Sequence, residues 1–242
     1  IFAHQDDEAL IIAKMASDTH FGADVHAVWI TDGSGTAPPH VRERESRNVM
    51  DLIGVPQENL YFLGYRDRDS WKSLDEVLSD VMEIARRVEP SEIVTNAYEG
   101  GNIDHDVANL TGAVVSSRVG DAVHYEFPLY NTYKGAYRVG KFLPFEGAET
   151  EYTRLNRHLL ILKDKVLEYY KSQAAVIGML KSVIDQRALK KYGEPYRICP
   201  PHDYTQRPVD EKLGYEINVR NPATFEDWKR VVLPFLEKIE KE

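Results

Sequence analysis

The first 130 residues alternate short apolar or β-branched runs with longer segments of helical periodicity, and this alternation constrains the fold more than any other feature. It is typical of βαβ units, in which a crossover helix joins two parallel strands. We therefore predict an α/β fold, a single domain over residues 1–242. Residues 1–130 would form the βαβ core, and residues 131–242 a helical and irregular C-terminal part of the same domain.

Periodicity and breakers place the elements more closely. The predicted strands cover residues 1–3, 24–31, 60–63, 92–96 and 122–127, and the predicted helices cover residues 8–17, 41–53, 73–88 and 104–117. Further on we expect a loop over 134–150, mostly helix over 157–191 with Gly178 as a candidate break, irregular chain over 193–223, and a last helix over 225–240. These elements predict a Rossmann-like, mostly parallel sheet flanked by helices. The chain opens at Ile1 inside a predicted strand, which leaves open whether residues precede it.

Charge and cysteine content narrow the classes of partner and compartment. With 39 acidic and 30 basic residues the net charge is −9, which argues against a nucleic acid or an anionic membrane as the main partner. Cys199 is the only cysteine, as expected for a reducing compartment. No apolar run approaches the roughly 20 residues of a transmembrane helix. We expect a cytoplasmic protein with a small-molecule substrate, and the sequence leaves homo-oligomerisation open.

The segment His4-Gln5-Asp6-Asp7-Glu8 places an imidazole and three carboxylates where the first strand turns into the first helix. In open α/β sheets, ligands bind outside the carboxyl ends of the strands, so these side chains would face the usual site. An alternative is purely structural: Asp6 would cap the helix, and Asp7 and Glu8 would interact favourably with its dipole.

A second polar cluster, Gly100 to Asp106, follows the predicted strand at 92–96 and opens the next helix. Here the structural alternative has Asp104 as the N-cap and His105 on the helix surface. Because the carboxyl ends of parallel strands meet at one edge of a sheet, we expect the two clusters to lie together. Their coincidence favours a functional site.

The combined residue types suit a catalytic metal. His4, Asp7 and His105 would supply the three nitrogen and oxygen ligands of a zinc site with one open position. Asp6 would remain free to accept a proton from a water molecule that the metal has acidified. An alternative is a phosphohydrolase in which Asp6, Asp7 and Asp104 hold Mg²⁺, although two histidines favour zinc.

These motifs resemble those of the PIG-L or LmbE-like N-acetylglucosaminyl deacetylases, zinc enzymes with a Rossmann-like fold. The first family motif, commonly Pro-His-Pro-Asp-Asp-Glu, is matched by Ala3 to Glu8, and the second, commonly His-Pro-Asp-His, by Asn102 to His105. Shorter similarities are found at 31–33, 62–65, Asp67 and 172–173, and at Arg42 and Glu45. The resemblance implies His4, Asp7 and His105 as zinc ligands and Asp6 as general base. It also implies hydrolysis of an N-acetyl group on an N-acetylglucosamine-type sugar or glycoconjugate.

The sequence departs from the family pattern at Gln5 and, more importantly, at Asn102. The family histidine at the latter position is thought to stabilise the oxyanion, and an amide supplies only a neutral hydrogen bond. We still assign Asn102 to the catalytic residues, place Asp104 behind the ligands as a supporting residue, and expect Asp32 and Arg42 to contact substrate. The departure keeps a second alternative open, a non-catalytic binding module that retains the metal site.

Overall fold

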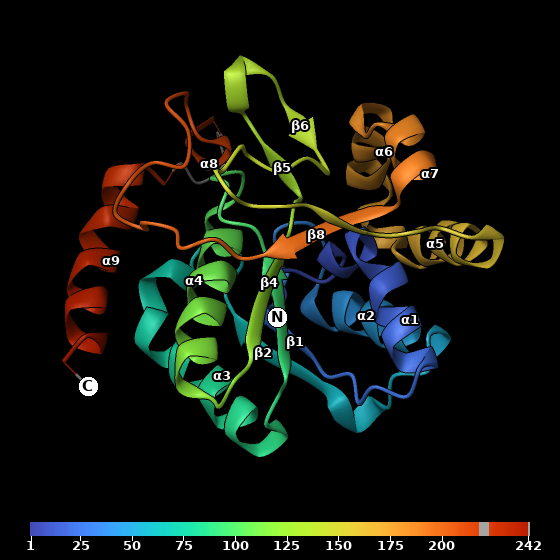
Figure 1. Ribbon diagram of the computed structural model, residues 1–242, viewed down its shortest axis with the longest axis horizontal. Helices are drawn as coiled ribbons and strands as arrows, with labels where there is room; N and C mark the ends of the chain where they lie inside the picture. The colour runs from blue at the N-terminus through green and yellow to red at the C-terminus, as the bar shows by residue number, and fades with distance from the viewer. Residues whose placement is uncertain (218–222, 242) are drawn as a thin grey trace.

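The structure, a computed structural model, describes residues 1–217 and 223–241 (Figure 1). Its strands are β1 (Ala27–Thr31), β2 (Leu60–Tyr65), β3 (Glu92–Asn96), β4 (Val123–Phe127), β5 (Tyr130–Asn131), β6 (Arg138–Val139), β7 (Glu151–Thr153) and β8 (Glu194–Ile198). Its α-helices are α1 (Ile12–His20), α2 (Pro39–Leu52), α3 (Leu74–Val88), α4 (Ile103–Arg118), α5 (Arg157–Tyr169), α6 (Ala174–Val183), α7 (Gln186–Tyr192), α8 (Gly214–Ile217) and α9 (Phe225–Ile239). Short 3₁₀ segments are η1 (Asp7–Leu10), η2 (Gln57–Asn59), η3 (Ser70–Ser73), η4 (Tyr133–Gly135) and η5 (Lys171–Gln173).

Two pairs of parallel strands form the centre of the fold, β1 with β2 and β3 with β4. Residues 1–3 lie between the pairs: the Phe2 amide donates to the Val28 carbonyl at 2.8 Å, and the Ile1 ammonium donates to the Val94 carbonyl at 2.8 Å. The predicted first strand is therefore present as a short bridge segment, and the carboxyl ends of residues 1–3 and β3 lie side by side.

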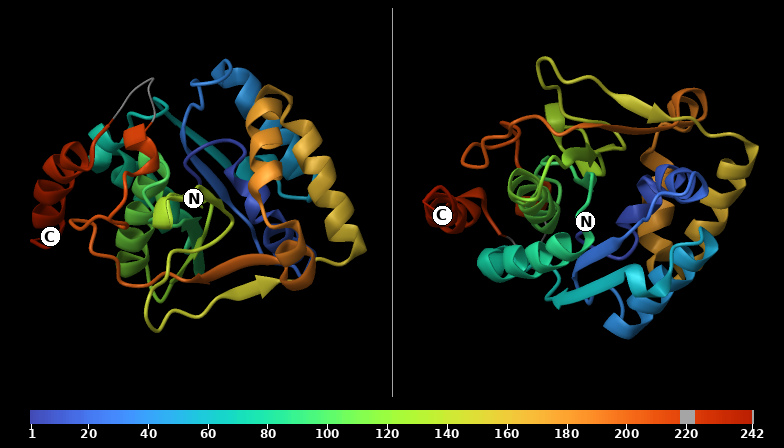
Figure 2. Two further views of the ribbon diagram at one scale, coloured as in Figure 1. Left: turned by 90° about the horizontal axis from the view of Figure 1, so that it is seen from above. Right: turned by 60° about the horizontal axis from the view of Figure 1, so that its bottom comes forward.

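Side chains of β1 alternate between two apolar cores, one on each face of the sheet. Val28 and Ile30 pack with α3, α4 and α9, whereas Ala27 and Trp29 pack with α1, α2 and α5. The ribbon views show these two helical layers on either side of the strands (Figures 1 and 2). A sheet that is buried on both faces is what parallel βαβ units require, and the predicted single-domain α/β class is confirmed.

The structure differs from the prediction in three places. Residues 194–198, expected to be irregular, form β8, which pairs antiparallel with β4 and β7. Gly178 does not break a helix, since α6 continues through it and the helical region is interrupted at 170–173 and 184–185 instead. The first predicted helix, at 8–17, is a 3₁₀ turn followed by α1, which begins at Ile12. Part of the predicted irregular segment, residues 218–222, and Glu242 lie outside the described residues.

None of the helices within residues 1–217 and 223–241 has the length and apolar character needed to cross a lipid bilayer.

Candidate active site

Asn96, the last residue of β3, joins the two clusters predicted from the sequence. Its side-chain Oδ1 accepts a hydrogen bond from the Ala3 amide at 3.0 Å, and its Nδ2 donates to Asp7 Oδ2 at 3.1 Å. The cluster at residues 4–8 therefore meets the β3 end of the sheet, from which residues 97–102 lead into α4. The prediction that both clusters share one sheet edge is consistent with this geometry.

The Asp7 carboxylate lies between two imidazole rings. Its Oδ2 is 3.6 Å from His4 Nδ1, and its Oδ1 is 3.4 Å from His105 Nε2. The ring centroids of the two histidines are 5.2 Å apart, and all three residues are buried. Burial alone would raise the pKa of Asp7, but the facing histidines outweigh it and hold the pKa well below its usual range. One ligand atom from each of these residues can reach a common metal position.

Two further carboxylates face the other side of the His4 ring. His4 Nε2 is 3.4 Å from Asp67 Oδ1 and 3.2 Å from Asp104 Oδ2. Burial lowers the pKa of His4, yet these aspartates together with Asp7 raise it well above its usual value. Three carboxylates thus surround two imidazoles in a buried space, which is an environment that favours a bound cation.

His105 provides the test of whether this set fits a metal. The ring is 1% exposed, and its Nδ1 has no hydrogen-bond partner. Buried polar atoms in proteins are almost always hydrogen-bonded, so hydrogen bonds within the protein do not account for all the polar atoms of this ring. Neutral imidazoles and a carboxylate are also the ligand types of catalytic zinc sites. The residues present therefore fit a divalent metal.

Asp104 is engaged mainly with the loop that follows β2. Its Oδ1 accepts from Ser70 Oγ at 2.6 Å, and its Oδ2 accepts from the Arg68 amide at 2.6 Å. The N-cap of α4 is Asn102, whose Oδ1 accepts from the Asp104 amide at 3.0 Å. The structural alternative, with Asp104 as the cap and His105 on the surface, is wrong. The geometry agrees with a supporting role for Asp104 behind His4.

Asp6 stands apart from the ligand cluster and is paired with Arg42. It adopts φ 128°, and its side chain does not cap η1, so the capping alternative is wrong here too. Its Oδ1 accepts from Arg42 Nη2 at 3.0 Å, and only 17% of its side chain is exposed. Burial raises the pKa of Asp6 to about 7, in spite of the opposing guanidinium. Asp6 is therefore a carboxylate held next to the cluster and outside it.

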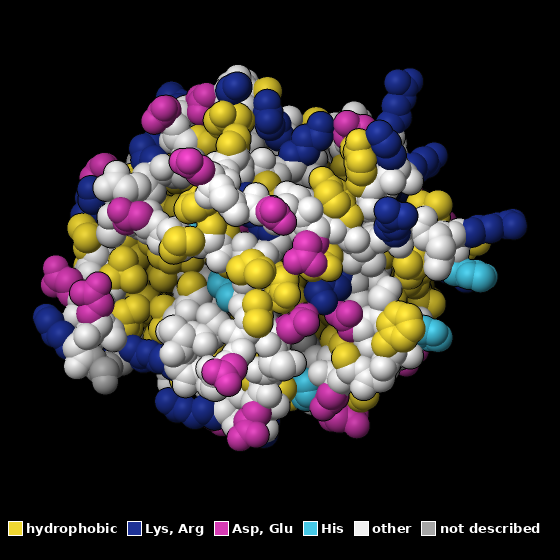
Figure 3. Space-filling view, in the orientation of Figure 1, with side chains coloured by type: hydrophobic (Ala, Val, Ile, Leu, Met, Phe, Trp, Pro, Cys, Tyr) yellow, Lys and Arg dark blue, Asp and Glu magenta, His cyan; other side chains and the backbone are white. Residues whose placement is uncertain are grey.

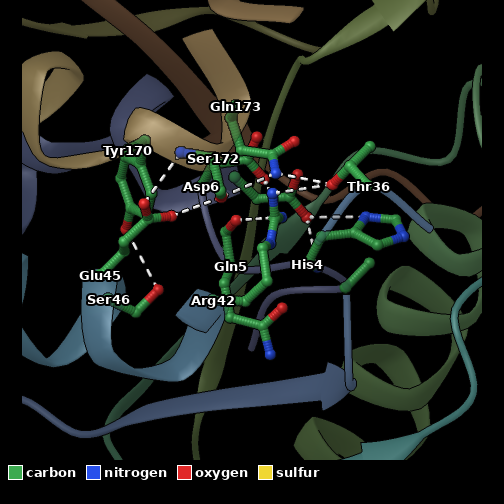
Figure 4. Close-up of polar contacts among 12 residues, drawn as sticks. His4, Gln5, Asp6, Thr36, Arg42, Glu45, Ser46, Tyr170, Ser172 and Gln173 are labelled. Carbon is green, nitrogen blue, oxygen red and sulfur yellow. Dashed lines mark hydrogen bonds and ion pairs between the residues drawn. The ribbon is translucent and has the colours of Figure 1, made fainter. Parts of the chain in front are cut away.

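A network from α2 and η5 surrounds this pair (Figure 4). Arg42 also donates to the Gln5 carbonyl and to Thr36 Oγ1, which in turn accepts from Gln173 Nε2 at 2.6 Å. Gly33 allows this close approach, because a Cβ there would lie 2.9 Å from Arg42 Nε. The 172–173 segment, noted above as a short similarity, thus reaches the residues around Asp6.

Arg42 and Asp32, the two residues expected to contact substrate, form hydrogen bonds with other residues of the protein. Arg42 is 3% exposed and bonded to Asp6 as described. Asp32 Oδ1 accepts from the Ser34 amide at 2.9 Å and from the Asp67 amide at 3.1 Å, which holds two loops together. Their contact with substrate stays a prediction.

The two residues assigned to catalysis border different cavities. Asn102 lines a cavity of about 370 Å³. Asp6 lines another of about 210 Å³, and Leu180 of α6 borders both. Helix α6 therefore borders both cavities.

Three residues at the site were not assigned from the sequence. Asp67, noted only as a short similarity, contacts His4, and Asn96 orients Asp7. A polar residue at the end of a predicted buried strand was an available signal for Asn96. Tyr130 packs the edge of its ring against His105, with ring centroids 5.2 Å apart. No local pattern marked Tyr130, because it lies 25 residues from His105 along the chain.

A second group of ligand-type side chains, Glu126, Cys199 and His202, lies away from these residues. Glu126 Oε1 accepts from Arg197 Nε at 2.7 Å, and its Oε2 pairs with His202 Nε2 at 2.9 Å. Burial and the Glu126 carboxylate raise the pKa of the Cys199 thiol. This group ties β8 and the segment that follows it to β4, so we interpret it as a structural polar network.

The N-terminal part of the chain is similar to a known protein family. Residues 1–115 match the sequence profile described as PIG-L, GlcNAc-PI de-N-acetylase. The matched segment contains both polar clusters, residues 4–8 and 102–105, and the match confirms the resemblance inferred from their motifs. No curated protein matches the chain.

Solved structures share the fold of this chain. A deacetylase of the teicoplanin biosynthesis pathway, in a complex with bog, has a TM-score of 0.66 at 18% identity, covering 81% of this chain and 95% of the other. The zinc-inhibited form of teicoplanin deacetylase Orf2 has a TM-score of 0.65 at 17% identity, with coverage of 81% and 95%. N,N′-diacetylchitobiose deacetylase from Pyrococcus horikoshii has a TM-score of 0.59 at 19% identity, with coverage of 83% and 82%. At these identities the likeness establishes the fold alone.

Proposed function

We propose that this protein is a metal-dependent hydrolase that removes the acetyl group from an N-acetylglucosamine-type sugar or glycoconjugate. The observation that carries the proposal is the Asp7 carboxylate between His4 and His105, with the separate carboxylate of Asp6 next to it in the chain. The PIG-L match over residues 1–115 supports an amide as the bond that is broken. Teicoplanin deacetylase and chitobiose deacetylase, which share the fold, support an acetylated sugar as the substrate class.

His4, Asp7 and His105 would hold the metal, and we propose zinc because of this ligand set. A zinc ion bound there would polarise the acyl carbonyl and make a water molecule more acidic. The ligands themselves are held in place by neighbours: Asn96 donates to Asp7, and Asp104 faces the distal nitrogen of His4. Such outer contacts orient ligands and strengthen metal binding.

Asp6 would act as the general base. Its carboxylate is not among the three ligand atoms that converge, and the Arg42 guanidinium fixes its position. After accepting a proton from water, Asp6 would pass it to the nitrogen of the leaving amine, so that the carboxylate is regenerated. Asn102 would donate a neutral hydrogen bond from Nδ2 to the oxyanion, since its Oδ1 already accepts from the Asp104 amide.

The alternative of a Mg²⁺-dependent phosphohydrolase receives no geometric support. Asp6, Asp7 and Asp104 do not form a converging ligand set in the part of the chain that the structure describes. Asp6 is paired with Arg42, and Asp104 is hydrogen-bonded to Ser70 and to the Arg68 amide.

The proposal is tested by measuring amine release from a panel of N-acetylated sugars with protein stripped of metal and then reloaded. We expect no release from the stripped protein and recovery with about one equivalent of Zn²⁺ per chain. A reloaded protein that binds the metal but releases no amine from any member of the panel would support the alternative of a binding module. Activity that is unaffected by stripping would refute metal dependence.

A further inference from the structure

The proposed mechanism gives no role to Glu8, a buried carboxylate next to the ligand Asp7. Acidic side chains normally remain in contact with water, as those on the face shown in Figure 3 do. Glu8 is instead 0% exposed. In the part of the chain that the structure describes, it is not among the groups that converge on a common metal position. Such a carboxylate must be held by hydrogen-bond donors that replace water.

The hydrogen bonds of the Glu8 carboxylate come from distant parts of the chain. Its Oε1 accepts from Ser46 Oγ of α2 at 3.0 Å and from the hydroxyl of Tyr170, the residue after α5. Its Oε2 accepts from Trp29 Nε1 of β1 at 3.2 Å and from the Asp6 amide at 3.0 Å. A carboxylate has about four acceptor positions, so these contacts use its capacity and fix its place in the structure.

The contact with the Asp6 amide matters because Asp6 has an unfavourable backbone conformation. Its φ of 128° and ψ of −17° lie where residues with a Cβ are rarely found. Such a conformation persists only where neighbouring groups enforce it. Here they hold both ends of one peptide unit, since Glu8 accepts from the Asp6 amide and Arg42 donates to the Gln5 carbonyl. Glu8 and Arg42 together therefore set the direction in which the Asp6 side chain leaves the backbone.

Tyr170 extends this support to the C-terminal part of the chain. It is 0% exposed, and its hydroxyl lies 3.2 Å from Ser46 Oγ as well as on Glu8. Ser46 follows Arg42 by about one turn of α2, so one helix carries a contact to each end of the peptide unit. Tyr170 lies outside residues 1–115, which match the family profile. A residue of the C-terminal part thus reaches the segment that carries the proposed base.

We propose that Tyr170, acting through Glu8, is a positioning residue for Asp6. The Tyr170 hydroxyl holds the Glu8 carboxylate against the Asp6 amide, and the peptide unit before Asp6 then keeps the Asp6 carboxylate beside Arg42 and outside the ligand set. The inference rests on the proposed function, because it concerns the base of the same site. Tyr170 and Glu8 transfer no proton and touch no substrate in this role.

Tyr170→Phe tests the proposal, because it removes the hydroxyl and keeps the ring that packs in the apolar core. We expect kcat for amine release to fall by about 10-fold to 100-fold, since a small displacement of a catalytic group is costly. KM and zinc content should stay at the wild-type values, because neither the ligands nor the substrate contacts change. A wild-type kcat, or a fall in zinc content that matches the fall in kcat, would overturn the proposal.

Tyr98→Phe is the matched control. Tyr98 is 4% exposed, and its hydroxyl donates to the Gln206 carbonyl at 2.9 Å, in the core on the other face of the sheet. The variant loses a buried hydrogen bond of the same kind and should keep the wild-type kcat. An equal fall of kcat in Tyr98→Phe and Tyr170→Phe would mean that general loss of packing explains both, and would count against the proposal.

A double-mutant cycle shows whether Tyr170 acts through Glu8. Glu8→Gln replaces the carboxylate by an amide of similar size, which lacks one of the two acceptor oxygens. We expect kcat to fall in this variant, and the addition of Tyr170→Phe to lower it further by less than about threefold, because both changes remove the same support. A further fall as large as that caused by Tyr170→Phe alone would show that Tyr170 acts independently of Glu8, and would refute the proposal.

A spectroscopic measurement separates this proposal from the activity. In ¹H–¹⁵N spectra of protein labelled at aspartate, the Asp6 amide is identified by its absence in Asp6→Asn. Its signal should move in Tyr170→Phe and stay in place in Tyr98→Phe, because only the first variant alters the Glu8 carboxylate that accepts from this amide. If the signal moves while the wild type releases no amine, the positioning contact stands and the proposed function fails. An unmoved signal in Tyr170→Phe would refute the positioning contact.

Discussion

Arg42 Nη2 donates to Asp6 Oδ1 at 3.0 Å, and this pair joins the N-terminal part of α2 to the carboxylate assigned as the general base. Arg42 is 3% exposed and also donates to the Gln5 carbonyl and to Thr36 Oγ1. The guanidinium therefore fixes both the backbone and the side chain of the segment that carries the base.

Arg42→Met is expected to lower kcat by about 100-fold while metal content is retained, because a small displacement of a catalytic group is costly and the ligands are untouched. Amine release and metal analysis on the same preparation check both parts. Arg47→Met is the control on the same helix, since Arg47 pairs with Glu43 near the surface. Loss of metal in Arg42→Met would show that Arg42 supports the ligands rather than the base.

The geometry allows two overlapping ligand sets, one of His4, Asp7 and His105 and one of His4, Asp67 and Asp104. The affinity of the protein variants for the metal should distinguish these sets. We expect His105→Ala and Asp7→Asn to weaken Zn²⁺ binding by more than about 100-fold, since each removes one of three ligands. Asp67→Asn should weaken it by only about 10-fold to 100-fold, as an outer residue that orients His4. Equilibrium dialysis measures these affinities, with the exposed His20→Ala as the control. Full metal binding by His105→Ala, with loss in Asp67→Asn, would favour the set of His4, Asp67 and Asp104.

Two substitutions separate the roles of Asn102. Asn102→Asp retains the oxygen that caps α4 but loses the Nδ2 donor, so stability should hold and kcat should fall by about 100-fold or more. Asn102→Ala loses both the capping oxygen and the Nδ2 donor, so kcat should fall and the free energy of unfolding should decrease by about 1 kcal/mol. Thermal melts and amine release give the two readouts. An unchanged kcat in both variants would contradict the assignment of Asn102 as an oxyanion donor.

The buried carboxyl group of Glu99 should make the stability of the fold depend on pH. It is 1% exposed and accepts hydrogen bonds from the Leu129 and Tyr130 amides and from Asn131 Nδ2. Burial nevertheless raises its pKa from 4.5 to about 7. Between these two values the unfolded chain releases the proton and the folded chain keeps it, so the free energy of unfolding falls as pH rises, by about 3 kcal/mol in total.

Urea unfolding of the wild type and of Glu99→Gln at pH 5 and pH 8 isolates this contribution. The wild type should lose about 2 kcal/mol more than the variant between the two pH values. Equal losses in the two proteins would mean that Glu99 is ionised in the folded state throughout this range.

Local sequence signals were sufficient for the elements with strong periodicity. Strand β3 was predicted with its observed bounds, and α3 and α4 to within one residue at each end, because apolar spacing and Pro90 mark their limits. Strand β8 was missed, since Pro195 and the surrounding turn formers argue against a strand. Its pairing partner β4 lies about 70 residues away along the chain, and such long-range pairing leaves no local pattern.

At the site, the sequence indicated which residues meet but not how they are held. His4 and Asp7 follow the short bridge segment, and His105 lies in the first turn of α4, the helix that follows β3. This order alone predicts their proximity. The contacts of Asp6 with Arg42 and of Asp104 with Ser70 join residues more than 30 positions apart. They depend on how the loops after β1 and β2 fold back, which hydrophobic periodicity does not encode.

The most direct test of the account is Asp6→Asn, which removes the proposed base and leaves the proposed ligands. Metal content and amine release should be measured on the same sample, with the exposed Asp121→Asn as the control. We predict that Asp6→Asn keeps one zinc per chain while kcat falls by about 10² to 10⁴, and that the control matches the wild type. Wild-type turnover in Asp6→Asn would contradict the central claim that Asp6 takes the proton in a metal-dependent deacetylation.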